Sequence, residues 1–151
     1  MIKIIRTTAD NPDFNKLIEL LNAELRERYV DQDTKFAPHN FLDPNVKTVL
    51  IYENNIPIAC GAFRENNIES NVEIKRMYTE KSSRSKGFGR KVLAELENWA
   101  AELNYKYAIL ETGDNQPEAI KLYKNMEYEQ IPNFPPYENI PESICMRKPL
   151  I

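Results

Sequence analysis

The chain has 151 residues, of which 42% are hydrophobic, 28% charged and 10% aromatic, and this composition excludes disordered, collagen-like and coiled-coil proteins. Its length suits a single domain over residues 1–151 with a sizeable hydrophobic core. Its net charge of −3 gives the molecule as a whole no electrostatic reason to bind nucleic acid or anionic lipid, so any anion site must be local.

The first part of the chain predicts a helix followed by an irregular segment. Residues 1–7 alternate basic and apolar side chains. Asn11 and Pro12 are typical of a helix start, since asparagine caps free backbone N–H groups and proline fits the first turn. Residues 31–44 lose the helical period and contain prolines, which predicts a loop or short irregular helix that shapes a binding site. The apolar face of the helix comprises Phe14, Leu17, Ile18, Leu21 and Leu25.

The middle of the chain predicts three antiparallel strands. Strands over residues 46–53 and 56–64 flank Asn54 and Asn55, which tolerate the positive φ of a tight hairpin turn. A further turn leads into a strand over residues 70–79, whose alternation divides its side chains between two faces. One face is expected to carry Val72, Ile74, Arg76 and Tyr78, and the other Glu73, Lys75 and Met77.

The second half of the chain predicts alternating helices and strands. Apolar spacing favours one helix over residues 90–104 and another over residues 117–125. Between them, the unbroken apolar run at residues 107–110 is typical of a strand covered on both faces, and it completes a strand-helix-strand crossover. Strands are also expected at residues 128–131 and 143–148, around an aromatic, proline-rich loop.

The cysteine content and the hydropathy of the sequence argue against disulfides, a zinc site and a membrane span. Cys60 and Cys145 are flanked by apolar residues, and two isolated cysteines form neither a disulfide framework nor a zinc site, so both are expected to be buried. No apolar run approaches the roughly 18 residues of a membrane span, and the N-terminus lacks the apolar core of a signal peptide. The sequence therefore predicts a soluble, cytoplasmic protein without a metal.

A basic, glycine-containing stretch separates the third strand of the meander from the next helix. Residues 75–91 contain seven basic residues against one acid in a chain that is acidic overall, which indicates an anionic ligand. Unpaired N–H groups and the dipole at a helix N-terminus favour a phosphate, and glycines let it approach the backbone. The stretch is neither a Walker A loop nor a dinucleotide fingerprint. It predicts a pyrophosphate cradle, with a solvated loop and an ordinary helix start as the alternative.

Two motifs carry a resemblance to a known family. Arg84-x-x-Gly87-x-Gly89 matches the pattern Q/R-x-x-G-x-G/A, and the segment from Asn115 to Tyr123 looks like the Asn/Tyr segment on the next helix. In these motifs and in its order of elements, the chain resembles the GNAT superfamily of acyl-CoA-dependent N-acetyltransferases. This resemblance implies an α/β (α+β) fold with a mixed, mostly antiparallel sheet of about six or seven strands, flanked by about four helices and splayed to hold CoA. Glu127 departs from the family, which commonly has glycine there.

The resemblance also implies where acetyl-CoA binds and where CoA leaves as product. The pantetheine arm would pair like an added strand with the backbone of Met77, Tyr78 and Thr79. Asn115 would bond the pantetheine or the start of its own helix. The motif residue Arg84 would also contact the cofactor. The pyrophosphate would be bound by the backbone amides of Ser85, Lys86, Gly87, Phe88, Gly89 and Arg90.

Acetyl transfer from a thioester to an amine requires a deprotonated amine, a donor for the developing oxyanion and an acid for the departing thiolate. Tyr123 matches the family's tyrosine near the cofactor sulfur, so it is expected to be the general acid, with a core aromatic as the alternative. Glu73 lies eleven positions before Arg84, the spacing at which some family members place a carboxylate that deprotonates the amine through water, so it is predicted to be the base. A salt bridge to Lys75 or Arg76 on the strand face is the alternative for Glu73, and Glu111 or water are the alternative bases. The resemblance implies direct transfer through a tetrahedral intermediate.

The acceptor is expected to be a primary amine of a small molecule. Its pocket is predicted to include Arg28, Tyr29, Phe134 and Tyr137, whose aromatic rings suit a small amine but are also explained by packing. Acetylation of a protein amine, or a non-catalytic acyl-CoA-binding module, are the alternatives, because family membership does not fix the substrate. Both a monomer and a homodimer are compatible with the sequence.

Overall fold

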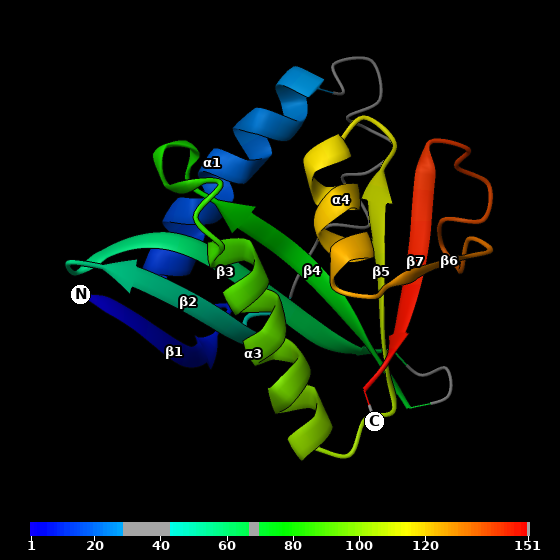
Figure 1. Ribbon diagram of the computed structural model, residues 1–151, viewed down its shortest axis with the longest axis horizontal. Helices are drawn as coiled ribbons and strands as arrows, with labels where there is room; N and C mark the ends of the chain where they lie inside the picture. The colour runs from blue at the N-terminus through cyan, green and yellow to red at the C-terminus, as the bar shows by residue number, and fades with distance from the viewer. Residues whose placement is uncertain (29–42, 67–69, 151) are drawn as a thin grey trace.

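The computed structural model describes residues 1–28, 43–66 and 70–150 as a mixed α/β fold (Figure 1). The predicted helices and strands are present, with small shifts at their ends; the helix predicted from residue 90, for example, begins at Phe88. In chain order, the elements are β1 (Ile2–Thr8), α1 (Pro12–Arg28), β2 (Lys47–Glu53), β3 (Ile56–Asn66), β4 (Asn71–Thr79), the 3-10 turn η2 (Lys81–Ser83), α3 (Phe88–Glu102), β5 (Tyr107–Gly113), α4 (Pro117–Asn125), β6 (Glu129–Ile131) and β7 (Ser143–Pro149).

A seven-stranded sheet in the order β1-β2-β3-β4-β5-β7-β6 forms the centre of the fold. Neighbouring strands are antiparallel except β4 and β5, which are parallel and joined by α3. α1 packs on one face of the sheet, and α3 and α4 pack on the other (Figure 1). These findings confirm the predicted mixed, mostly antiparallel sheet. The described residues contain three α-helices and one 3-10 turn, where about four helices were expected.

The parallel strands β4 and β5, at the centre of the sheet, pair with each other along only part of their length. β4 and β5 pair from Asn71 with Tyr107 to Ile74 with Leu110, and the pairing stops there. Both strands continue beyond this point, and their carboxyl ends diverge toward the top of Figure 1. Backbone groups along the diverging edges lack a partner strand, so the sheet is open at this point to a molecule that can bond them.

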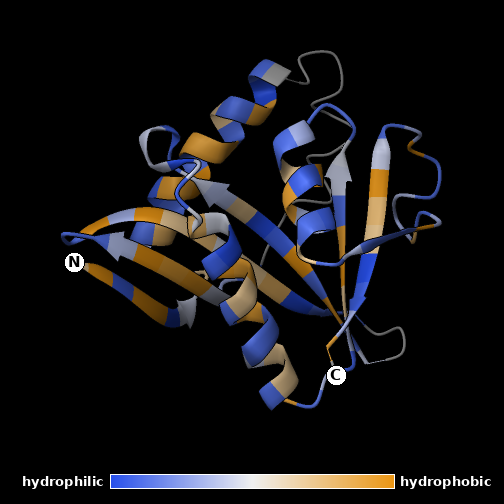
Figure 2. Ribbon diagram, viewed as in Figure 1, coloured by the Kyte–Doolittle hydropathy of each residue, from blue (hydrophilic) through white to orange (hydrophobic). Residues whose placement is uncertain are grey.

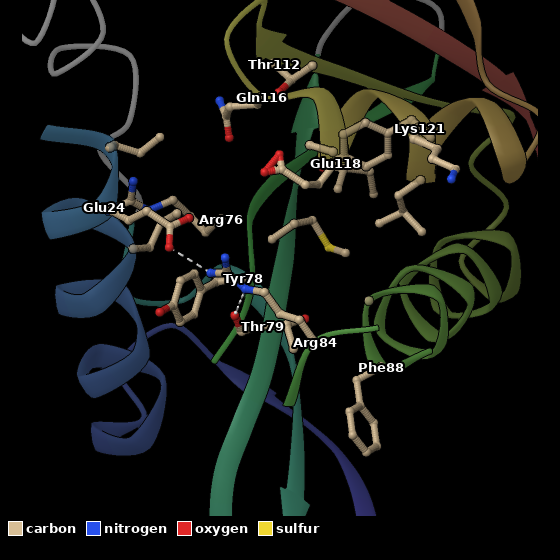
Figure 3. Close-up of a pocket in the computed structure, with 18 of the residues that line it drawn as sticks. Glu24, Arg76, Tyr78, Thr79, Arg84, Phe88, Thr112, Gln116, Glu118 and Lys121 are labelled. Atoms are coloured by element: carbon tan, nitrogen blue, oxygen red, sulfur yellow. Dashed lines mark hydrogen bonds and ion pairs between the residues drawn. The ribbon is translucent and has the colours of Figure 1, made fainter. Parts of the chain in front are cut away.

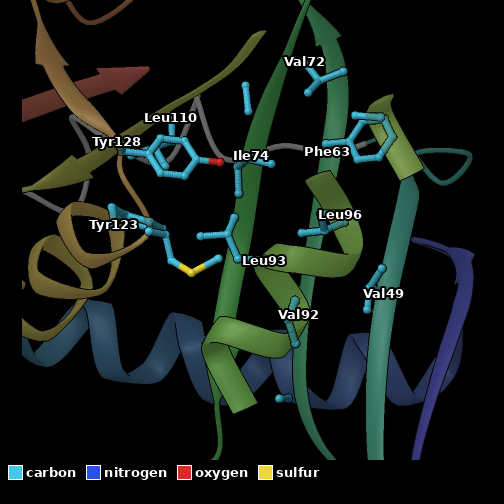
Figure 4. Packing of buried hydrophobic residues seen from close by; sticks show 14 of the residues in the cluster. Val49, Phe63, Val72, Ile74, Val92, Leu93, Leu96, Leu110, Tyr123 and Tyr128 are labelled. Carbon is cyan, nitrogen blue, oxygen red and sulfur yellow. The ribbon is translucent and has the colours of Figure 1, made fainter. Parts of the chain in front are cut away.

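Each face of the sheet has its own hydrophobic core. α3 buries Val92, Leu93 and Leu96 on one face (Figure 4). α1 buries Leu17 and Leu21 on the opposite face. Apolar and polar residues alternate around both helices, as the predicted helical spacing requires (Figure 2). We refer to these two sets as the α3 core and the α1 core.

A third core lies under the loop between β6 and β7. Ala108 and Leu110 of β5 face the α3 core, whereas Ile109 faces this third core. The strand predicted at residues 107–110 is therefore covered on both faces, as its unbroken apolar run indicates. The buried members of the third core are Ile109, Phe134, Tyr137 and Cys145.

β4 contains a β-bulge opposite β3. Tyr78 pairs with Cys60 and Lys75 pairs with Ala62, so two residues of β4 lie opposite one residue of β3. Arg76, inside the bulge, has a φ of 59°, which is the left-handed conformation. Because strand alternation has a period of two, one extra residue moves the following side chains to the opposite face.

The bulge overturns part of the predicted facing of this strand. Ile74 lies in the α3 core, as expected. Beyond the bulge, however, Met77 packs against the α3 core and Tyr78 lies in the α1 core. The guanidinium of Arg76 likewise reaches Asn22 of α1. The prediction that Arg76 and Tyr78 share the face of Ile74 is therefore wrong, because residue alternation does not reveal an inserted residue.

Gly61 of β3 lies against both the bulge and α3. A Cβ there would lie 2.5 Å from Met77 Sδ, 2.8 Å from Val92 Cγ1 and 2.9 Å from Leu96 Cδ1. We expect Gly61→Ala to lower the free energy of unfolding by about 1–3 kcal/mol, a fall in Tm of roughly 3–10 °C, because the buried helix has no space to retreat. Thermal and denaturant unfolding measure both quantities.

Gly87→Ala provides the control for this overpacking. No heavy atom lies within 4 Å of a Cβ at Gly87, although its φ is 86°. The left-handed conformation alone is expected to cost about 1 kcal/mol with alanine. A loss of stability in Gly61→Ala no larger than in Gly87→Ala would contradict the close packing of β3 on α3.

Asn54, Asn55 and Glu127 are among the polar residues that adopt the left-handed conformation. Asn54 and Asn55 have φ values of 51° and 69° and form the predicted turn between β2 and β3. Glu127, directly after α4, has a φ of 71°. Glutamate thus takes the left-handed backbone conformation that glycine favours at a helix end.

Candidate active site

A cleft of about 920 Å³ lies where β4 and β5 diverge (Figure 3). Its walls come from α1, the carboxyl-terminal parts of β4 and β5, the start of α3, and α4. The loss of strand pairing beyond Ile74 creates the opening. The residues predicted to bind the cofactor that line this cleft are Met77, Tyr78, Thr79, Arg84, Ser85, Gly87, Phe88, Gly89 and Arg90.

The glycine-containing stretch forms one end of the cleft. Gly87 precedes α3 with a φ of 86°, and the space where its Cβ would lie is open. The first hydrogen bond of the helix runs from the Lys91 N–H to the Gly87 carbonyl, so the amides of residues 88–90 have no acceptor within the helix. Gly87 also supplies no side-chain cap. Together with the helix dipole, these amides favour an anion such as a phosphate.

Arg84 connects the end of β4 with α1. Its Nε donates to the Thr79 carbonyl at 2.8 Å, and its Nη2 lies 2.8 Å from Glu24 Oε1 (Figure 3). Its guanidinium also lies 5.4 Å from the centre of the Tyr78 ring. Because Glu24 already balances the charge of Arg84, we expect Arg84 to hold the loop in position more than to neutralise a bound phosphate.

Tyr123 of α4 belongs to the α3 core and also to the cleft wall. Only 6% of the residue is exposed, and its ring meets that of Tyr128 edge to face with 5.9 Å between centres. Burial, and then the charge of Glu111, raise the pKa of Tyr123, so its hydroxyl stays protonated at neutral pH. Among the described residues, this hydroxyl has no hydrogen-bond partner. It can therefore donate a hydrogen bond or a proton to a bound group.

Glu111 of β5 places a carboxylate in the cleft wall. The Ser143 hydroxyl donates to Glu111 Oε2 at 2.7 Å. Burial raises the pKa of Glu111, although the Ser143 bond and the charge of Lys75 partly oppose this effect. A carboxylate with a raised pKa is suited to accept a proton near neutral pH.

Glu73 lies in a buried polar cluster and is 1% exposed. Its carboxylate oxygens lie 3.4 Å from Arg64 Nη2 and 3.6 Å from Lys75 Nζ. The Tyr137 hydroxyl donates to Glu73 Oε2 at 3.3 Å and accepts from Lys75 Nζ at 2.9 Å. Glu73 is not among the residues that line the cleft, whereas Lys75 is. The cluster therefore meets the cleft through Lys75.

Four of the predicted binding residues lie outside the cleft wall. Lys86 and Asn115 are not among the lining residues, although Gln116, at the N-cap position of α4, is. Phe134 and Tyr137 pack together in the third core, with 5.6 Å between ring centres. Their predicted contact with the acceptor therefore stays a prediction.

From the sequence, the early helix was expected to reach the acceptor pocket only near its end, at Arg28 and Tyr29, and the polar residues of its preceding turns were missed. Asn22 and Glu24 line the cleft, and Asn22 Oδ1 accepts a hydrogen bond from Arg76 Nη2 at 3.0 Å. These polar residues flank the apolar face of the helix, and only the packing of α1 on the sheet shows that they lie at the cleft. Of the acceptor residues predicted nearby, Arg28 ends α1 and Tyr29 lies outside the described residues.

Both cysteines are buried, as predicted, and neither lines the cleft. Burial raises the pKa of Cys60 to about 12 and that of Cys145 to about 11, so both remain thiols at neutral pH. Within residues 1–28, 43–66 and 70–150, no group of histidine, cysteine and acidic side chains is arranged to hold a metal ion. No helix of that part of the chain has both the length and the apolar character needed to cross a membrane.

Comparisons with known proteins agree with this geometry. The model of the acetyltransferase (GNAT) family matches residues 14–128. An IAA acetyltransferase from Azospirillum brasilense is 28% identical over 136 residues, which cover 89% of each chain. A Klebsiella pneumoniae structure assigned as an acyl-CoA N-acyltransferase has a TM-score of 0.82 and 30% identity, covering 100% of this chain and 99% of that one. A GNAT acetyltransferase from Elizabethkingia anophelis, solved with acetyl-CoA bound, has a TM-score of 0.69 and 20% identity, covering 98% and 97%.

Proposed function

Because the chain belongs to the acetyltransferase (GNAT) family and is an acyltransferase, we propose that it moves the acetyl group of acetyl-CoA to a primary amine of a small molecule. The proposal rests on one observation: a single cleft joins the free amides at the start of α3 with Tyr123 and Glu111. The first part of this cleft suits a phosphate, and the second suits proton transfer. We propose that residues 1–151 carry out this reaction as one domain.

The cleft residues fit acetyl-CoA, which supplies an activated acetyl group on a thiolate leaving group. The amides of residues 88–90 and the open space at Gly87 are proposed to bind the pyrophosphate. The open edge of β4 at residues 77–79 is proposed to pair with the amides of the pantetheine arm. Acetyl-CoA bound in the related Elizabethkingia structure supports this choice of donor.

Direct transfer assigns three functions to this chain. A backbone N–H of Met77 or Tyr78, next to the bulge, is proposed to stabilise the negative charge that develops on the thioester oxygen. Glu111 is proposed to take a proton from the amine, directly or through water, and Tyr123 is proposed to give one to sulfur. The N–C bond forms and the C–S bond breaks, giving an N-acetylated product and CoA. Glu73 is the alternative base, although its carboxylate is already ion-paired.

Acetyl-CoA and CoA are expected to raise the Tm by about 5–10 °C at a hundredfold excess over Kd. Binding at that excess adds about 2.7 kcal/mol to the stability of a domain of this size. ATP is expected to shift the Tm less, because it offers phosphates but no pantetheine arm for the edge of β4. Differential scanning fluorimetry measures the three shifts, and no shift at saturating acetyl-CoA would contradict the donor site.

Release of free thiol from acetyl-CoA, measured over a panel of amines, tests the transfer itself. Turnover on small amines supports the proposal. Turnover confined to protein lysines would identify a protein amine as the acceptor. Binding of acetyl-CoA without turnover on any amine would instead favour a non-catalytic acyl-CoA-binding module.

A further inference from the structure

Arg76 occupies an unusual position in the cleft wall. It lies in the bulge of β4 with a φ of 59°, and its side chain extends from the diverging strand toward α1 (Figure 3). Its Nη2 donates to Asn22 Oδ1 at 3.0 Å. Without the bulge, strand alternation would turn this guanidinium to the α3 face. The fold therefore places a cation on the α1 side of the splay, close to the proposed reaction centre.

The guanidinium of Arg76 is partly buried, and none of the carboxylates in the described residues pairs with it. Among the described residues, no carboxylate lies within ion-pair distance of it. Burial lowers the pKa of Arg76, and no acidic side chain in residues 1–28, 43–66 or 70–150 opposes that effect. Two other cations of the cleft are balanced, because Arg84 pairs with Glu24 and Lys75 pairs with Glu73. A partly buried charge that no described residue balances is a site for a ligand anion.

The acetyl donor does not supply this anion. Its phosphates are proposed to lie at the start of α3, whereas the Arg76 side chain extends from the bulge to Asn22 of α1. Its pantetheine arm is uncharged, and it is this arm that passes residues 77–79. An anion at Arg76 must therefore come from the second substrate, whose amine has to reach the thioester beside the bulge.

We propose that the acceptor is a small amine that carries a carboxylate, as an amino acid does, and that Arg76 and Asn22 bind this carboxylate. The inference rests on the proposed acetyltransferase function and specifies its acceptor. A guanidinium offers two parallel N–H donors that match a carboxylate. Asn22 Oδ1 is bonded to Arg76, while the amide NH2 of Asn22 has no acceptor among the described residues and can add a third donor.

The same arrangement disfavours cationic acceptors. Polyamines and aminoglycosides would bring positive charge close to Arg76, which no carboxylate of the described residues pairs with. An amine whose carboxylate is replaced by a carboxamide would leave the Arg76 guanidinium unbalanced in the complex. The presence of the carboxylate is therefore expected to control the KM of the acceptor, and its effect on kcat is expected to be smaller.

Matched acceptors and two variants test this assignment. The acceptors are amino acids, their carboxamides and the corresponding decarboxylated amines, assayed by thiol release at saturating acetyl-CoA. The wild-type KM is expected to be at least about tenfold lower for the amino acid than for its carboxamide. Arg76→Gln is expected to raise the KM for the amino acid about 10- to 100-fold and to change that for the carboxamide little.

Asn22→Asp is the second variant, since it leaves the bulge intact. The new carboxylate would pair with Arg76 and compete with the acceptor, so the same rise in KM is expected. Arg147→Gln is the control, because it removes an exposed cation that does not line the cleft. Its KM values should match those of the wild type.

A binding measurement decides the inference independently of turnover. With CoA present, N-acetylated amino acids are expected to raise the Tm of the wild type, and their carboxamides and both cleft variants should show little shift. Equal KM values for amino acids and carboxamides, or no added Tm shift by any N-acetylated amino acid, would overturn the carboxylate site. Failure of the acetyltransferase function would appear separately, as the absence of any Tm shift with acetyl-CoA.

Discussion

Tyr123→Phe is expected to lower kcat about 10²- to 10³-fold while the Kd of acetyl-CoA stays unchanged. The substitution keeps the ring that packs against Tyr128 and removes only a hydroxyl that has no hydrogen-bond partner among the described residues. Because burial and Glu111 raise the pKa of Tyr123, the wild-type hydroxyl is a proton donor throughout the neutral range. Steady-state kinetics together with calorimetric binding of acetyl-CoA separate the two effects.

Tyr128→Phe is the matched control for this variant. Tyr128 belongs to the same aromatic pair, but its hydroxyl donates to Glu97 at 2.9 Å and it does not line the cleft. We expect this variant to keep its kcat and to lose at most about 1–2 kcal/mol of stability with the hydrogen bond. Equal kcat values for Tyr123→Phe and the wild type would remove Tyr123 from the reaction and leave it as a core aromatic.

Glu111→Gln is expected to lower kcat/KM about 100-fold at neutral pH. It is also expected to abolish the fall in kcat/KM at acidic pH, which is the acidic limb of the pH profile. As a base, Glu111 must be deprotonated, so the kcat/KM of the wild type should fall as the pH drops through the pKa of Glu111. Burial raises that pKa, so the limb is expected above the ordinary range of a glutamate. Profiles of kcat/KM against pH for both proteins measure the effect.

The stability of the Glu111→Gln variant shows whether its loss of activity comes from the missing base or from impaired folding. A carboxyl group whose pKa is raised in the folded state stabilises the fold below its unfolded pKa, and this contribution is lost as the pH rises through the folded pKa. At pH 7 the ionised Glu111 is therefore unfavourable for folding, and glutamine can still accept the Ser143 hydrogen bond. The free energy of unfolding of this variant at pH 7 should be no lower than that of the wild type.

Glu73→Gln distinguishes the alternative bases. Its main expected effect is a loss of stability, because it removes the carboxylate that faces Arg64 and the buried Lys75. If Glu73→Gln abolished the acidic limb and Glu111→Gln kept it, Glu73 would be the base. If both variants kept the acidic limb, neither carboxylate would be the base, and water alone would accept the proton of the amine.

Short-range patterns in the sequence were sufficient for much of this fold. Pro12 begins α1, and Asn54 and Asn55 form the β2–β3 turn, because capping and positive φ depend on the residues themselves and their immediate neighbours. Apolar spacing predicted which sides of α1 and α3 would be buried. The basic, glycine-containing stretch before α3 was likewise visible, because a helix N-terminus is a local feature.

The bulge in β4 was not predictable in the same way. It depends on the pairing of β4 with β3, on Gly61 leaving space for Met77 and on the packing of α3 over both strands. These contacts join residues distant in sequence, so alternation within β4 predicted the wrong face for Arg76 and Tyr78. The Arg76–Asn22 contact, which depends on that reversal, could be seen only in the folded structure.

The different roles of Glu73 and Glu111 were likewise visible only in the tertiary structure. The sequence determined that Glu73 and Glu111 lie in adjacent strand regions, and family resemblance favoured Glu73 by its spacing from Arg84. Tertiary structure decided that Glu73 is ion-paired in a buried cluster and that Glu111 lines the cleft. The physical reason is that local sequence fixes secondary structure and helix ends, whereas the environment of a carboxylate depends on charges and surfaces brought together from distant parts of the chain.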